Sequence, residues 1–162
     1  FWLLILGNEM RAGLGPLMEQ NGDWKMKKAY RLLTDGVPEI EDRDGFLKAY
    51  AMRSTLLRKW QLFFEEFPLL LTAVTWAKPM VDDYDVSECV DADWFRRVYA
   101  PISGTPTIGL PGLSVLVGAK PGLPMGVQLL ASRHGDRRLM EAGTVLERAI
   151  GPIRPVDPVA VA

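Results

Sequence analysis

Apolar residues recur every three or four positions through the middle of the first half of the chain. They are Ala49, Met52, Leu56, Trp60, Phe63 and Phe67, with charged residues between them. This spacing places the apolar side chains on one face of a helix, and it predicts a helix from Arg43 to Glu66. A stripe of aromatic side chains at that spacing is typical of a packed core, so we interpret it as core.

The same periodicity predicts four further helices. Asp23, Asp93 and Asp136 each precede such a segment and are expected to cap it, while Asn21-Gly22 closes the first one. The helices are expected at Trp2–Met18, Trp24–Leu33, Trp94–Tyr99 and Asp136–Ile150, in addition to the long one.

Short unbroken apolar runs predict strands at 69–75, 113–117 and 127–131. The last two each follow a Gly-Leu-Pro phrase and contain a single polar residue, which is typical of strands buried on both faces. We predict two adjacent central strands joined by a tight turn at 119–124. The segments 76–93 and 101–111 are expected to be loops.

Helices that alternate with buried strands predict an α/β fold with a mixed buried sheet flanked by helices. A chain of 162 residues has the length of one domain. We expect that domain at 1–150, followed by an extended, proline-rich tail at 151–162.

Composition excludes several classes of function. Nineteen basic and twenty acidic residues leave a net charge of −1, which offers no patch for nucleic acid. Cys89 is the single cysteine, so an internal disulfide is excluded and a reducing, cytoplasmic location is expected. The apolar run Phe1–Leu6 is too short to span a membrane, which takes about 20 residues, and no membrane partner is expected. A start inside an apolar helix suggests a piece of a longer protein.

Three groups of residues invite a catalytic or metal-binding interpretation, and each has a simpler one. Ser132, His134 and Asp136 include the residue types of a serine hydrolase, but a turn and a helix start account for them better. Acidic residues between Asp82 and Asp93 lack the glycine that a calcium loop needs, so a solvated loop is expected. Acidic neighbours disfavour Cys89 as a nucleophile. No cofactor and no metal site is predicted.

Two phrases identify a family resemblance. Gly-Leu-Pro-Gly-Leu-Ser-Val at 109–115 and Gly-Leu-Pro-Met-Gly-Val-Gln-Leu-Leu at 122–130 resemble the C-terminal core of amidase signature enzymes. Arg53, Trp60 and Phe64, with the LLLT run at 69–72, are similar to the helix and strand that precede this core. Leu116 and Pro106 depart from the pattern, in which proline and asparagine are usual.

The resemblance implies an amide hydrolase that cleaves C–N bonds with a Ser–cis-Ser–Lys triad and an oxyanion loop of adjacent glycines and serines. No Gly-Gly and no Ser-Ser pair occurs in this sequence. We therefore expect the C-terminal part of an amidase, without catalytic residues and inactive alone. The alternative is a non-catalytic binding or interaction module that keeps part of the fold.

The resemblance also implies which residues line the substrate cleft. By position these are Thr75, Trp76, Ser103 and Thr105. The expected partner is a small-molecule amide, bound only when the N-terminal portion of the enzyme is present. Self-association through apolar surface that such a portion would cover is a further expectation.

Overall fold

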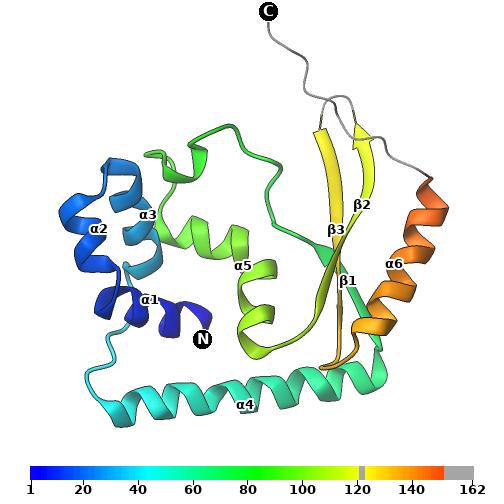
Figure 1. Ribbon diagram of the computed structural model, residues 1–162, viewed down its shortest axis with the longest axis horizontal. Coiled ribbons are helices and arrows are strands. Elements are labelled where there is room, and N and C mark those ends of the chain that lie inside the picture. Colours follow the sequence, from blue (N-terminus) through cyan, green and yellow to red (C-terminus); the bar gives the residue numbers. More distant parts are fainter. Residues whose placement is uncertain (121–122, 152–162) are drawn as a thin grey trace, which may run out of the picture.

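The computed structural model describes residues 1–120 and 123–151 and arranges them around a small sheet (Figure 1). Helices α1–α3 gather at one end, α4 runs beneath the whole molecule, and α6 lies along the sheet at the other end. The elements are α1 Trp2–Ala12, α2 Gly15–Asn21, α3 Trp24–Thr34, α4 Arg43–Glu66, β1 Leu69–Ala73, the 3-10 turn η1 Tyr84–Val86, α5 Ala92–Ile108, β2 Gly112–Lys120, β3 Leu123–Ala131 and α6 Asp136–Ile150.

The three described strands pair antiparallel in the order β1-β3-β2. The α/β class and the pairing of the two Gly-Leu-Pro strands are confirmed, but the described sheet is antiparallel and not mixed. Only β3 is central. In β2, Val115 is buried while Ser114 and Leu116 are exposed, so this outer strand is covered on one face. An outer antiparallel strand needs to bury only one face, and the expectation of two doubly buried strands was wrong for β2.

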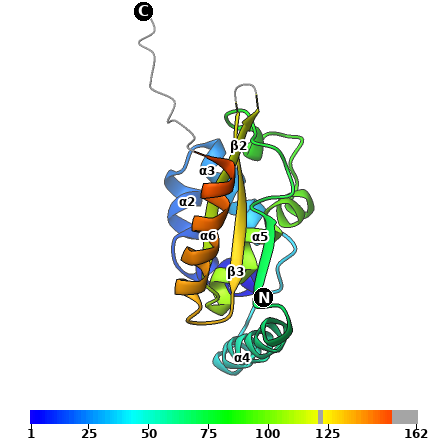
Figure 2. The same cartoon turned by 90° about the vertical axis from the view of Figure 1, so that its right-hand side faces the viewer.

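Each face of the sheet carries its own apolar cluster. On one face, Leu129 and Ala131 of β3 and Val115 of β2 pack against Leu139 of α6. On the opposite face, Leu130 packs with Phe64 of α4, Ile108 at the end of α5 and Leu110. Figure 2 shows α6 and α5 on opposite sides of the strands. Alternate residues of β3 thus belong to opposite cores, as the pleat of a strand requires.

Two of the predicted helices agree closely with the structure. The long helix α4 has the predicted bounds, and the side chain of Asp42 accepts a hydrogen bond from Gly45 N at 2.7 Å. The predicted cap of α3 is confirmed, because Asp23 Oδ1 accepts from Met26 N at 2.8 Å.

The first predicted helix is two helices. A break at Gly13–Leu14 separates α1 from α2, and Pro16 lies at the start of α2, where its missing N–H costs nothing. Gly15 allows the turn to pack closely, because a Cβ there would lie 2.7 Å from both Met10 O and the hydroxyl oxygen of Tyr30. Helical spacing continued across the break and hid it.

The predicted loop at 101–111 is wrong, because α5 continues through Pro101 and Pro106 to Ile108. Asp91, and not Asp93, caps the helix by accepting from Trp94 N at 2.7 Å. Proline inside a helix removes a backbone donor and clashes with the carbonyl four residues earlier, so it bends the helix. Burial of Val98, Thr105 and Ile108 keeps the chain helical despite that cost.

The last helix has the predicted bounds but not the predicted cap. Asp136 is its first residue and makes no capping hydrogen bond, while Gly135 is the cap. A carboxylate in the first turn still interacts favourably with the helix dipole. The predicted tail at 151–162 lies outside the described residues except for Gly151, and so do residues 121–122 of the predicted turn. In the part of the chain that the structure describes, no helix has the length and apolar character to cross a membrane.

Candidate functional site

The residues predicted to line a cleft surround α5. A cavity of about 280 Å³ lies between this helix, α4 and the strand β1. We call it the Trp60–Trp76 cavity, after the indole rings contributed by α4 and by the segment after β1. Its walls also include Leu70, Thr72, Thr105 and Leu130. Of the predicted residues, Trp76 and Thr105 meet here.

The bend in α5 fixes the position of Trp76. Trp76 N donates a hydrogen bond to Val98 O at 2.9 Å, so the segment after β1 is tied to the helix. Val98 lies one turn before Pro101, in the part of the helix whose carbonyls the proline disturbs. The indole of Trp76 stays 65% exposed, so it forms a rim of the cavity instead of filling the core.

Thr105 carries a buried hydroxyl with no hydrogen-bond partner among the described residues. The residue is 7% exposed and lines the cavity. Other helical hydroxyls of the chain bond the carbonyl four residues earlier, as Ser103 does to Tyr99 O at 2.7 Å and Thr107 to Ser103 O at 3.2 Å. A buried polar atom without a partner costs about 1–3 kcal/mol. The unpaired hydroxyl of Thr105 is therefore the polar feature that this apolar cavity offers.

A second unpaired acceptor lies on the same face of the sheet. Gln128 is opposite Thr72 on β1 and Ser114 on β2, so a row of three polar residues crosses the three strands. Gln128 is 9% exposed, and its Oε1 has no partner among the described residues. Since Thr72 also lines the Trp60–Trp76 cavity, the polar row begins at the wall of that cavity.

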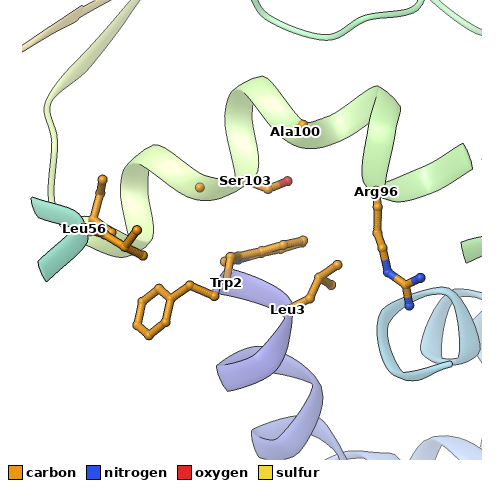
Figure 3. Close-up of a pocket in the computed structure, with 9 residues that line it drawn as sticks. Trp2, Leu3, Leu56, Arg96, Ala100 and Ser103 are labelled. Carbon is orange, nitrogen blue, oxygen red and sulfur yellow. The ribbon is translucent and has the colours of Figure 1, made fainter. Parts of the chain in front are cut away.

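Ser103 faces a different cavity, of about 310 Å³, on the other side of α5 (Figure 3). Ser103 and Ala100 of α5 lie over Trp2 and Leu3 of α1 in this view. Ala100 and Gly104 line both cavities, so only these small residues of α5 separate them. The structure therefore does not bring Ser103 together with Thr105.

Thr75 lines a third, open hollow of about 470 Å³, which it shares with Trp76, Lys78 and Met125. Its hydroxyl donates to Ala77 O at 3.0 Å and so stabilises the turn after β1. Trp76 is thus the residue common to the first and third hollows, while Thr75 serves the backbone.

The described residues that line the Trp60–Trp76 cavity include no titratable side chain. Arg96, beside the second cavity, is occupied by Asp93 Oδ1 at 2.8 Å and by Asp35 O. Burial raises the pKa of the Tyr99 phenol above its ordinary value, and Asp85 adds to that effect, so Tyr99 is neutral at pH 7. The cavity can accept a neutral group, but none of these side chains supplies a base.

The other candidate groups do not assemble into sites. No hydrogen bond within the described part of the chain joins Ser132, His134 and Asp136, and His134 is exposed in a turn with φ 66°. Within residues 1–120 and 123–151, no group of three or more His, Cys, Asp or Glu side chains is placed to hold a metal ion. Cys89 is exposed.

Sequence reasoning missed Trp60 and Thr72 as cavity residues. Trp60 belongs to the apolar stripe of α4, where periodicity cannot separate a core side chain from one that faces a cavity. Thr72 is the polar residue of an apolar strand, and this was the signal available for it.

No protein-family model matches the chain. Among curated proteins, it is 36% identical over 116 residues to an indoleacetamide hydrolase of Bradyrhizobium japonicum, a match that covers 69% of this chain and 24% of that protein. It is 31% identical over 115 residues to an indoleacetamide hydrolase of Bradyrhizobium diazoefficiens, covering 69% of this chain and 22% of the relative. One component of the Glutamyl-tRNA(Gln) amidotransferase of Rhodospirillum rubrum is 34% identical over 107 residues, which are 64% of this chain and 20% of that relative.

These relatives are members of the amidase signature family, and this chain belongs to that family, as its paired Gly-Leu-Pro phrases predicted. The particular relatives it resembles are hydrolases of indoleacetamide and components of a tRNA-dependent amidotransferase. The match spans about a quarter of the length of the indoleacetamide hydrolases, at 24% and 22%.

Proposed function

We propose that this chain is the C-terminal part of an amidase-type hydrolase that cleaves C–N bonds of amides. The observation that carries the proposal is its 36% identity over 116 residues to an indoleacetamide hydrolase. The Gly-Leu-Pro phrases of the resemblance flank and enter the β2–β3 ladder, so the matching sequence corresponds to one packed unit.

In this proposal the chain contributes binding and not bond cleavage. Its Trp60–Trp76 cavity is lined by aromatic and aliphatic groups with threonine hydroxyls, and the described residues that line it lack a general base. Hydrolysis of an amide needs an activated nucleophile and donors for the developing oxyanion. The nucleophile, the bridging serine and the lysine that the family resemblance implies would come from outside these residues.

A chimera tests the proposal. This chain would replace the region that it matches in the Bradyrhizobium japonicum indoleacetamide hydrolase, and ammonia release from indoleacetamide would be measured. We expect turnover by the chimera and by the intact relative, and none above the uncatalysed rate by the 162-residue chain alone.

Two results would contradict the proposal. One is amide turnover by the purified chain alone, which would require a catalytic centre within it. The other is a folded chimera that hydrolyses nothing while the intact relative is active, which would leave the chain as a binding module.

A further inference from the structure

The Trp60–Trp76 cavity has the size for a molecule larger than a single ring. A cavity of about 150 Å³ holds benzene. The cavity between α4, α5 and β1 measures about 280 Å³ and can therefore take two fused rings. Its aromatic walls come from Trp60 and Trp76, and flat aromatic groups gain energy from offset or edge-to-face contact with such rings.

The charge of the cavity restricts the ligand to an uncharged group. None of the described residues lining it is titratable, and an ion placed there would lose its hydration without gaining a partner. A carboxylate or an ammonium group is therefore disfavoured inside the cavity. An aromatic or aliphatic body remains.

The hydrogen-bonding capacity of the cavity specifies one polar group on that body. Thr105 lines the cavity, is more than nine-tenths buried, and has an Oγ1 with no partner among the described residues. Gln128 Oε1, on the same sheet face as Thr72, is a second unpaired acceptor. An acceptor without a donor is satisfied by an N–H group.

We infer that the Trp60–Trp76 cavity binds a neutral, fused two-ring aromatic group that carries a ring N–H, with Thr105 Oγ1 as the acceptor of that N–H. The binding step depends only on residues of this chain. The description of the ligand as the aromatic end of an amide substrate rests on the proposed function.

Side-chain N–H signals of the five tryptophans report the binding of indole to the 162-residue chain by nuclear magnetic resonance. We expect saturable shifts of the Trp60 and Trp76 signals, with smaller changes at Trp24 and Trp94. Trp2 lines the neighbouring cavity and serves as an internal control. Shifts confined to Trp2, or no saturable shift at any tryptophan, would overturn the inference.

The N–H contact is tested by pairing a ligand change with a variant. Indole should bind the unmodified chain about tenfold more tightly than 1-methylindole, because one hydrogen bond to a buried acceptor is lost. Thr105→Val keeps the shape of the side chain and should abolish this preference. Thr144→Val is the matched control, since the Thr144 hydroxyl lies on α6 and already bonds Met140 O at 2.8 Å.

Equal affinity of the unmodified chain for the two ligands would overturn the role of Thr105, even if the variant did not fold. The indole assay and the amidase assay have separate readouts. Ring binding without turnover by the chimera would refute the hydrolase proposal alone, and turnover without ring binding would refute the cavity assignment alone. Displacement of indole by the remaining part of the chimera would overturn the inference, because protein would then fill the cavity.

Discussion

Gly109 ends α5 in a conformation that suits glycine. Its φ is 79°, its N–H bonds Pro106 O, and the next N–H, of Leu110, bonds Thr105 O. Arg53 lies over this turn and donates from Nε to Thr107 O at 2.8 Å. The residue therefore sets both the end of the helix and the entry of the chain into β2.

We predict that Gly109→Ala destabilises the fold by about 1–2 kcal/mol, because an L-residue disfavours positive φ. The new Cβ would also lie 2.8 Å from Arg53 Nη2. Gly104→Ala is the matched control within the same helix. No atom lies within 4 Å of a Cβ at Gly104, and the exchange should stabilise the helix by about 0.5–1 kcal/mol. Urea unfolding of both variants measures the two effects; equal and small changes would refute the turn argument.

Individual residues also mark how far sequence reasoning reached at this scale. Asp23 was correctly assigned as a cap because it stands directly before a periodic segment. Asp93 was not, because Asp91 is an equally good cap two residues earlier and only the start of α5 decides between them. Spacing identifies candidate caps, whereas the backbone conformation selects one of them.

At the scale of elements, α4 was predicted to the residue because a long amphipathic pattern has many positions that agree. The helix α5 was not, since Pro101 and Pro106 normally end a helix and here burial outweighs their cost. The cavity followed from this error: its wall is the bent helix, which the sequence predicted as a loop. The residues Trp76 and Thr105 were named correctly as neighbours, but their meeting depends on that bend.

One ion pair joins α3 to the turn η1. Lys25 Nζ donates to Asp83 Oδ2, and this hydrogen bond, reinforced by the carboxylate charge, raises the pKa of Lys25. A folded pKa above the unfolded value means that the contribution to stability is present below about pH 10. That contribution is lost as the pH rises through the folded pKa of Lys25.

We predict that Asp83→Asn weakens the alkaline loss of stability. Asparagine tolerates the left-handed conformation of residue 83, whose φ is 61°, so the turn should survive. Urea unfolding midpoints between neutral pH and about pH 11 give the comparison. Glu141→Gln, which breaks the pair with Arg137, is the control and should leave the alkaline limb unchanged, because arginine stays charged throughout. An unchanged limb in Asp83→Asn would contradict the prediction.

At the scale of the whole molecule, α6 covers one side of the sheet while β1 remains an outer strand. Leu71 of β1 lies opposite Leu129 and is 56% exposed. An outer strand with an exposed apolar side chain offers unpaired backbone groups and apolar area to another chain. The expectation of self-association from the sequence therefore has a specific place on the structure.

We predict that the chain forms larger species as its concentration rises, and that Leu71→Lys weakens this association by about tenfold, since a charge would have to be buried. Met140→Lys is the control, because Met140 is 61% exposed on α6 and not beside an outer strand. Sedimentation equilibrium measures both. A monomer at every concentration, or equal effects of the two variants, would contradict the prediction.

The helix between the first two cavities is only as thick there as Ala100 and Gly104 allow. Any larger side chain at either position would narrow both chambers at once. Enlarging one chamber while preserving the other would require changes at their outer walls, in α1 and in α4. The preference of each chamber for its guest is therefore inherited jointly, through two of the smallest side chains in the molecule.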